Sequence, residues 1–255
     1  MNNLRAFVAI LFVLSLAGCA SLKTYNPATG QKEFIFISAA DEIKLGESIH
    51  RQILEQYSLS ADPALNQKVN TVGERLAHIS DRQDYAYQFS VIDDKELNAF
   101  TIPGGHIYIF RGLLERLKSD DQLASVLAHE IGHCAAKHTV KKFQAAMGYN
   151  LISSIALGAL GEGPSQQLAS LGTNAVMQIT FSAYGRKDEY QADNLGLKYL
   201  RLAGYDTRAM IEVFEILKAA SEGAEPPAIL STHPHLNDRI VAVQEQIRAV
   251  EAQEK

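Results

Sequence analysis

VLAHEIGHCAAKHT, residues 126–139, decides how the rest of the chain is interpreted, because two histidines flank a glutamate there in the pattern H-E-x-x-H. Apolar residues recur at helical spacing from Leu123 to Ile131, and the preceding SDDQ, residues 119–122, resembles a capping box at the start of a helix. The motif is therefore predicted to lie inside a helix, where residues four apart share one face.

This spacing predicts a zinc site. His129 and His133 can direct two imidazoles at one ion, and zinc prefers histidine nitrogen and carboxylate oxygen in tetrahedral geometry. Glu130 is rotated by about 100° around a helix of ~3.6 residues per turn, so it need not bind the metal. It is predicted to take a proton from an attacking water as a general base.

The third ligand separates the subtypes of such sites. Metzincins need a later histidine with a glycine before it, but Thr139 and Ala136 occupy those positions, so that subtype is excluded. Gluzincins take a glutamate from a later helix, and GRKDEYQADNLG, residues 185–196, offers Glu189 and Asp193 four residues apart. Glu189 would then bind zinc and Asp193 would orient a ligand histidine. A solvated, charged helix face is the alternative for this segment taken alone.

The remaining pattern predicts a single α+β domain over residues 38–255, mostly helical with a small sheet. Alternating aromatic residues and a run of β-branched and aromatic residues predict two strands, at residues 85–93 and 106–110. Other helical patterns, several with an N-cap residue at their start, cover residues 38–57, 62–79, 165–203, 206–220 and 237–251. A softer helix with a loop is expected at 143–163, and a proline-containing loop at 222–234.

Composition limits the possible functions. The chain has 255 residues, 47% of them hydrophobic, which is enough to bury a sizeable core. Its formal net charge is −5 and it has no dense block of Lys and Arg, so nucleic-acid binding has no support. Cys134 follows His133 directly, and we expect it to be a small buried packing residue rather than a catalytic thiol.

The N-terminus is typical of a secreted lipoprotein. Residues 1–18 form a signal peptide in shape, with one arginine and an apolar run over residues 6–17 that is too short for a comfortable membrane span. LAGC, ending at Cys19, resembles a bacterial lipobox, which implies cleavage before Cys19 and its lipidation. Residues 19–37 are then the lipidated cysteine and a linker; an uncleaved signal anchor is the alternative. Ala20 resembles the residue found there in lipoproteins sorted to the outer membrane.

Four motifs together resemble the HtpX and CAAX-prenyl-protease family of zinc metallopeptidases. They are HEIGHCAAKH from residue 129, EYQAD from residue 189, STHP from residue 231 with Arg239 six residues past its histidine, and NAFTIPGG, residues 98–105. The short lipoprotein form is similar to the soluble periplasmic branch that contains LoiP and BepA. The resemblance spans about residues 41–239 and implies a gluzincin-type domain, in which the edge strand of a small sheet flanks the active-site helix.

The resemblance also implies roles for individual residues. His129, His133 and Glu189 would hold one Zn²⁺, with Glu130 as general base and later general acid. His233 and Arg239 would stabilise the oxyanion of the tetrahedral intermediate. In an alternative that stays open here, His233 approaches the zinc and closes the site in a resting state.

A second set of roles concerns substrate. The resemblance places Asn98 and Ala99 on an edge strand that pairs with substrate backbone. His138 matches a family histidine without a deducible role. It is expected not to bind metal, as are His106 and His235.

The sequence therefore predicts a zinc metalloendopeptidase attached by lipidated Cys19 to the periplasmic face of the outer membrane. An edge strand selects extended backbone, so unfolded or misfolded envelope proteins are the expected substrates and quality control the expected role.

Two other functions compete with this one. Glu130-x-x-His133 and Glu47-x-x-His50 fit a di-iron bundle, but such a site needs four inward-facing helices, and the predicted strand pair interrupts them. A zinc-stabilised, lipid-anchored chaperone or assembly factor for outer-membrane proteins, with little proteolysis, is the second alternative. The intact Glu130 argues against an inactive protease.

Overall fold

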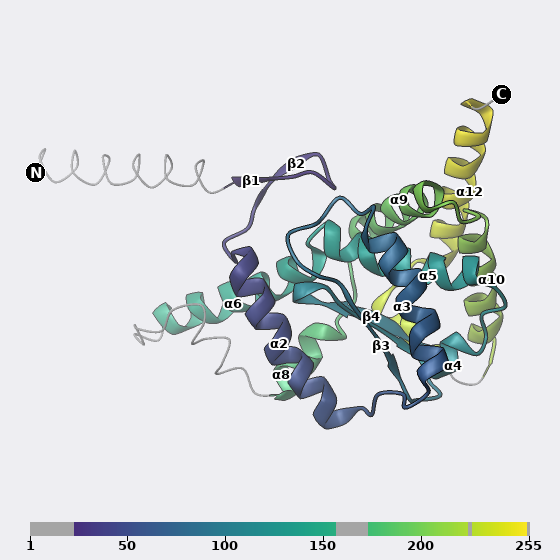
Figure 1. Ribbon diagram of the computed structural model, residues 1–255. Coiled ribbons are helices and arrows are strands. Elements are labelled where there is room, and N and C mark those ends of the chain that lie inside the picture. Colours follow the sequence, from purple (N-terminus) through teal and green to yellow (C-terminus); the bar gives the residue numbers. More distant parts are fainter. Residues whose placement is uncertain (1–22, 157–172, 224–225, 254–255) are drawn as a thin grey trace, which may run out of the picture.

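The computed structural model describes residues 23–156, 173–223 and 226–253, and Figure 1 shows helices gathered around a small sheet. This confirms the expected α+β fold, mostly helical. No helix in the described ranges is both long and apolar enough to cross a membrane.

The central sheet has three strands in the order β3-β5-β4. β3 (Gln88–Ile92) runs parallel to β5 (His106–Phe110), and β4 (Ala99–Ile102) runs antiparallel to β5 on its other side. The sequence HIYIF of β5 is buried at every position, as expected for β-branched and aromatic residues in a central strand. β4 is therefore an edge strand of this sheet.

Helices cover both faces of the sheet. Side chains alternate between faces along a strand, so Ile107 and Ile109 pack into the larger core while Tyr108 and Phe110 pack into a second one. The larger core takes in α3 (Pro63–Ala77) and α5 (Asp120–Ala135), and the second takes in α2 (Ala39–Gln56). The expected caps of α2, α3 and α5 are present, since the side chains of Ser38, Asp62 and Ser119 accept backbone N–H groups there.

The helix α5, which carries the H-E-x-x-H motif, lies at the centre of the domain (Figure 1) and is buried from Gln122 to Ala135. A helix enclosed on all sides has no solvent face. Leu127 and Ile131 pack into the larger core, and the polar residues of the motif are consequently held at fixed positions inside the protein.

In its described part, the second half of the chain is helical. Its helices are α6 (His138–Ala156), α8 (Thr173–Thr180), α9 (Arg186–Ala203), α10 (Ala209–Ser221), the short α11 (Ile229–Thr232) and α12 (Leu236–Gln253). Of these, α6, α9 and α10 pack on α5. The α5 helix packs closely on α9, because small residues meet there. Gly132 faces Ala192, and Gly196 faces the backbone of Ala128 and His129. The short elements η1 (Pro103–Gly105) and α4 (Arg111–Leu114) flank β5.

A small hairpin occupies part of the segment expected to be a linker. β1 (Lys23–Asn26) pairs antiparallel with β2 (Gln31–Phe34) through a turn in which Gly30 has a φ of 64°. The Gln144 amide of α6 holds the chain beside it, donating to Phe34 O and accepting from Phe36 N, each at 2.8 Å. A linker prediction from composition misses this, because the hairpin depends on a residue 108 positions away.

Two predicted element boundaries differ from the structure in the first half of the chain. The strand predicted at 85–93 is limited to β3, because its partner β5 offers five residues for pairing. Tyr85 lies outside the strand and packs instead under the Arg82 guanidinium, whose Cζ is 4.2 Å from the ring centroid. The helix predicted at 143–163 begins earlier, at His138, and residues 157–163 lie outside the described ranges.

Three further boundaries differ in the second half. The helix predicted at 165–203 is interrupted at residues 181–185, between α8 and α9, and residues 165–172 lie outside the described ranges. Asp206 accepts the backbone N–H of Arg208 in a turn, so α10 starts later, at Ala209. The loop predicted at 222–234 contains α11.

Candidate functional site

Four side chains converge between α5, α9 and the end of α11. They belong to His129, His133, Glu189 and His233, and their ligand-type atoms lie within 4.8 Å of one another. His133 Nε2 is 3.0 Å from His129 Nε2 and 3.3 Å from Glu189 Oε1, and His129 Nε2 is 3.7 Å from Glu189 Oε2. All four residues are buried.

These separations fit one metal ion. Ligand atoms on a tetrahedral zinc with bonds of ~2.0–2.1 Å lie roughly 3.3–3.4 Å apart, close to the observed 3.0–3.7 Å. Two imidazoles and one carboxylate are a donor set that zinc uses in catalytic sites. His129, His133 and Glu189 therefore form a zinc-binding site, as the sequence predicted.

The close packing of α5 and α9 makes this convergence possible. Glu189 and Asp193 lie one turn apart on α9 and straddle Ala192, which rests on Gly132 of α5. Because α9 approaches at this point, the carboxylate of Glu189 reaches the two histidines across the helix interface. The alternative of a solvated charged face for this segment is excluded, since Glu189 and Asp193 are buried.

Asp193 and Arg239 form a second layer behind the ligands. Asp193 Oδ1 lies 2.9 Å from His129 Nδ1, so His129 can donate from Nδ1 and keep Nε2 for a metal. Arg239 donates to both oxygens of Asp193, at 2.7 and 2.6 Å. Its Nη1 also lies 2.5 Å from Glu189 Oε2, an ion pair without hydrogen-bond alignment. His233 and Arg239 lower the pKa of Glu189, and Arg239 lowers the pKa of Asp193, although burial opposes both shifts.

Glu130 stands beside the ligand cluster without a hydrogen-bond partner among the described residues. Both carboxylate oxygens are buried, and the nearest basic group is His233 Nε2, 3.6 Å from Oε1. Burial raises the pKa of Glu130, while the neighbouring His233 and His129 oppose that rise. A carboxylate with free lone pairs and a raised pKa can accept a proton and return it.

A small cavity adjoins Glu130 between α5, α10 and α11. The lining is mostly apolar, from Val126 of α5, from Met210, Val213, Phe214 and Leu217 of α10, and from Ile229 of α11. Its volume is about 30 Å³, which exceeds the roughly 10–15 Å³ that a cavity needs to hold one water molecule.

His233 fills the remaining side of the cluster. Its Nδ1 lies 3.2 Å from His129 Nε2 and 3.1 Å from Glu189 Oε1, so the structure has four ligand-type groups facing one point. Glu189 and Glu130 raise the pKa of His233 against the effect of burial. The ring of Tyr184, from the chain that precedes α9, stacks on His133 with centroids 3.9 Å apart.

His138, which the sequence left without a role, lies directly against a ligand. Its Nδ1 is 2.9 Å from His133 Nδ1, and its Nε2 is 3.0 Å from Gln191 Oε1. Sequence spacing did not reveal this contact, because residues five apart do not share a helix face. The contact depends on the break between α5 and α6, where Lys137 has a φ of 57°.

The residues predicted to bind substrate lie on or beside the edge strand. Asn98 precedes β4 and its carbonyl accepts from Phe110 N at 3.0 Å, so its backbone faces β5. Antiparallel strands direct alternate residues to opposite edges, and Ala99 therefore presents its N–H and C=O to the outer edge of β4. The side-chain oxygen of Asn98 is buried without a partner among the described residues. Cys19 lies outside the described ranges.

Other candidates from the sequence do not join the centre. Within the described ranges His129, His133, Glu189 and His233 make the one cluster of metal-binding type, so Glu47 and His50 add no second half-site. His50 instead hydrogen-bonds Tyr108 and stacks on His106. Cys134 contacts Thr101 Oγ1 at 2.8 Å, and burial raises its thiol pKa to about 12, which fits a packing residue.

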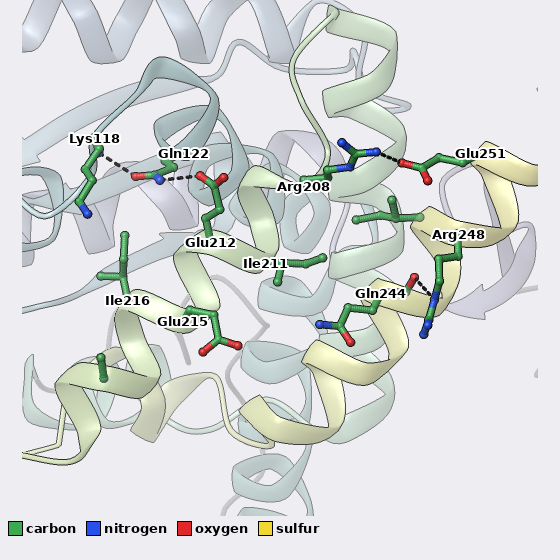
Figure 2. A pocket seen from close by; sticks show the side chains of 12 residues that line it. Lys118, Gln122, Arg208, Ile211, Glu212, Glu215, Ile216, Gln244, Arg248 and Glu251 are labelled. Carbon is green, nitrogen blue, oxygen red and sulfur yellow. Dashed lines mark hydrogen bonds and ion pairs between the residues drawn. The ribbon is translucent and has the colours of Figure 1, made fainter.

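A larger cleft of about 990 Å³ lies elsewhere, between α10 and α12 beside the start of α5 (Figure 2). Some of its polar groups are paired with one another, as Figure 2 shows for the ion pair of Arg208 with Glu251 and for the hydrogen bond from Gln122 to Glu212. None of the zinc ligands lines it.

The fold and the site have the arrangement of the gluzincin class of metallopeptidases, with H-E-x-x-H on one helix and a glutamate ligand from a later one. The chain belongs to peptidase family M48, whose model matches residues 63–247. It is 30% identical over 222 residues to the beta-barrel assembly-enhancing protease of Escherichia coli, covering 84% of this chain and 45% of that protein. It is also 30% identical over 225 residues to the mitochondrial metalloendopeptidase OMA1 of Schizosaccharomyces pombe, covering 87% of this chain and 65% of that protein. The chain thus spans between 45% and 65% of the length of these two relatives.

Proposed function

We propose that this chain is a zinc-dependent endopeptidase that cleaves unfolded or misfolded proteins of the bacterial envelope. The observation that carries the proposal is Glu130, a buried carboxylate that has no hydrogen-bond partner in the described part of the chain and lies beside three zinc ligands. A stabilising role would leave such a group paired, since an unpaired buried carboxylate is costly. A catalytic base must be free to accept a proton.

The residues of the site would divide the reaction as follows. Zinc, when bound, makes water a better nucleophile at neutral pH and polarises a carbonyl oxygen. Glu130 would accept the proton of the attacking water and later deliver it to the leaving amine. Asp193 holds His129 in the tautomer that leaves Nε2 free. Arg239 holds Asp193 and Glu189, and with His233 it would place positive charge near the developing oxyanion.

His233 has a second proposed role, in a resting state. Its Nδ1 faces the same point as the ligand atoms of His129 and Glu189, where substrate would otherwise approach. We infer that this arrangement is latent, and that His233 turns away from the ligands when substrate enters. Removal of the His233 imidazole should then raise basal cleavage if closure dominates, and lower it if oxyanion stabilisation dominates.

The substrate class follows from the outer edge of β4. The backbone N–H and C=O of Ala99 point to this edge but are buried, as is the side-chain oxygen of Asn98, which has no partner among the described residues. An extended peptide could pair with Ala99 and contact Asn98 once the segments that cover β4 move aside. Folded proteins seldom offer a free extended segment, so unfolded chains are the expected substrates. Equal cleavage of one protein in folded and unfolded form would count against this argument.

We further propose that the protein is attached to the periplasmic face of the outer membrane. Support comes from the signal-peptide pattern and the lipobox that ends at Cys19. Mass spectrometry of the protein purified from bacterial membranes would detect the lipid on Cys19. A chain that begins at Met1, or a free Cys19 thiol, would contradict the proposal.

A lipid-anchored chaperone or assembly factor for outer-membrane proteins is the second candidate. The observation that favours it is the closed arrangement of His233 over the ligands, which limits cleavage. Zinc content and casein cleavage, measured for wild type and Glu130→Gln, separate the two. Zinc near one per chain in both, with cleavage only by the wild type, supports the protease. If neither the wild type nor Glu130→Gln cleaves casein, and His233→Ala does not cleave it either, the result supports the chaperone.

A further inference from the structure

His138 occupies an unusual place beside the zinc ligands. It is the first residue of α6, it is buried, and its ring meets His133 edge-on with centroids 5.0 Å apart. The preceding Lys137 adopts a left-handed conformation with a φ of 57°, which costs free energy for a residue with a Cβ atom. This turn reverses the chain at the end of α5 and brings His138 back against the ligand.

The contacts of His138 fix where its proton lies. Its Nε2 is 3.0 Å from Gln191 Oε1 and 3.5 Å from Asp188 Oδ1, and an ionised carboxylate can only accept. Nε2 of His138 is therefore the protonated nitrogen, and Nδ1 carries the lone pair. Because this Nδ1 lies 2.9 Å from Nδ1 of His133, His133 must be the donor between them.

We propose that His138 is a positioning residue that sets the tautomer of His133, with Gln191 and Asp188 setting that of His138. A neutral imidazole that donates from Nδ1 keeps the lone pair of Nε2 free. Nε2 is the atom of His133 that faces His129 and Glu189. The polar chain thus extends from the surface of α9 to the metal site, and it orients His133 as Asp193 orients His129. The inference rests on the proposed zinc site.

The test exchanges acceptor for donor at Gln191, which is only partly buried. Gln191→Glu keeps an acceptor for His138 Nε2, whereas Gln191→Lys offers only donors and reverses both hydrogen bonds. We expect zinc affinity, measured by chelator competition, to stay near wild type in Gln191→Glu. It should fall by about 10–100-fold in Gln191→Lys and in His138→Leu. Cleavage by Gln191→Lys should recover when zinc is raised, which a folding defect would not allow.

Charge alone could shift zinc affinity, so a second readout is needed. Nitrogen NMR of the zinc-free protein reports which ring nitrogen of His133 is protonated. We expect Nδ1 to carry the proton in wild type and Gln191→Glu, and Nε2 to gain it in Gln191→Lys. An unchanged tautomer in Gln191→Lys would overturn the proposal, as would full zinc affinity in His138→Leu. Zinc content of the wild type, measured in parallel, tests the proposed zinc site separately.

A second inference rests on the hairpin and on no residue of the zinc site. Among the described residues, the exposed large aromatic side chains are Tyr25, Phe34 and Phe36, with 60%, 46% and 42% of their surface exposed. Phe34 and Phe36 contact each other edge-on, with ring centroids 6.2 Å apart. Phe34 and Phe36 are thus a contiguous exposed apolar pair, and contiguous apolar surface is a feature of interaction sites.

The hairpin turns this group away from the domain. Tyr25 pairs with Lys32 across the strands, so both point to the face that also carries Phe34, two residues on. The opposite face carries Glu33, which accepts from Asn26 at 3.1 Å and from Lys141 of α6 at 2.7 Å. The inner face is therefore bound to the protein, and the outer face presents aromatic rings and a lysine.

We propose that this face lies on the lipid surface of the membrane, an inference that rests on the proposed lipid anchor. β1 begins at Lys23, four residues after Cys19, and four residues span at most about 14 Å. A lipid on Cys19 would hold the hairpin at the headgroups. Tyrosine, phenylalanine and lysine side chains are favourable in the headgroup layer, because the rings can enter the lipids while the ammonium group stays near the phosphates.

The test uses the absence of tryptophan from the chain. Phe34→Trp in the full lipoprotein, reconstituted in phosphatidylethanolamine–phosphatidylglycerol vesicles, makes one fluorophore on the proposed face. We expect a blue-shifted emission that brominated lipids quench at least two-fold. The matched control is Leu202→Trp, an exposed apolar position on α9, which should emit as in water and resist quenching.

Every other outcome opposes the proposal. Water-like emission from Trp at position 34 would show that the face is free. A blue shift without lipid quenching, growing with protein concentration, would show that a second copy covers it. Failure of the chain to float with vesicles would overturn the lipid anchor as well. Cleavage of casein by the same samples tests the proposed protease activity independently of the fluorescence and flotation results.

Discussion

Gly132 of the zinc-binding helix lies directly against Ala192 of α9, and a Cβ atom added to Gly132 would meet the carbonyl oxygen of Ala192 at 2.8 Å. That atom belongs to helix backbone and cannot rotate away. We therefore expect Gly132→Ala to push the two helices apart and to weaken zinc binding at least ten-fold, because Glu189 then no longer reaches both histidines. Chelator competition and thermal unfolding would measure the effect. Gly148→Ala on α6 is the control, since a Cβ there meets nothing within 4 Å. Equal zinc affinity in both variants would contradict this account.

Arg239 is expected to stabilise the domain as well as the site. Its guanidinium is buried and contacts the carboxylates of Asp193 and Glu189, so Arg239→Leu would leave two buried negative charges without their partner. Breaking such a pair costs about 3–5 kcal/mol of unfolding free energy. Arg186→Leu, which removes the exposed ion pair with Asp238, should cost less than about 1 kcal/mol. Denaturant unfolding of the zinc-free variants measures both, and similar losses would refute the prediction.

Acid should destabilise the fold partly through His106. Burial lowers the pKa of His106 to about 4, with a smaller contribution from the neighbouring His50, against an ordinary value near 6.5 in the unfolded chain. Between pH ~6.5 and about 4 the unfolded chain therefore binds more protons, and stability falls as the pH drops through that window.

The His106→Phe variant isolates this effect. We expect its unfolding free energy, measured by urea denaturation without zinc, to depend less steeply on pH than that of the wild type. Other buried histidines contribute in both proteins, so the difference in slope is the measured quantity. Parallel pH profiles would show that His106 is not responsible.

The two cysteines should differ in reactivity. Burial raises the thiol pKa of Cys134 to about 12, so the folded protein at pH 8 should resist alkylation at this position. In denaturant Cys134 should react, and a lipidated Cys19 should not, because its sulfur is then a thioether. Titration with a thiol reagent should accordingly find no reactive group in the native protein and one after unfolding. Two groups after unfolding would contradict lipidation.

Local sequence signals predicted the parts of this fold that depend on neighbours in the chain. The caps at Ser38, Asp62 and Ser119 and the helical repeat around His129 are determined within one or two turns. The spacing of Glu189 and Asp193 places both on one helix face, but taken alone it also fitted a solvated charged face, and the gluzincin pattern was needed to identify Glu189 as a ligand. The family resemblance added His233 and Arg239, whose positions near the ligands no spacing argument could supply.

The remaining features depend on contacts between distant residues. The hairpin was missed because Gln144 of α6 stabilises its end, and the strand at 85–93 was overextended because β5 limits pairing. His138 received no role because its contact with His133 requires the left-handed turn at Lys137, which favours glycine or asparagine and is not evident from a lysine. A sequence pattern describes a single element, whereas these residues act between elements.

The distance along the chain between Arg239 and His129, 110 residues, has a consequence for biosynthesis. A chain that is translated from its N-terminus presents the zinc-binding helix long before α12 exists to carry Arg239. Asp193 and Glu189 then lack the cation that balances them, so the complete site cannot assemble on a partial chain. A protease with the proposed preference for unfolded backbone would thereby stay inactive while the nearest unfolded backbone is its own.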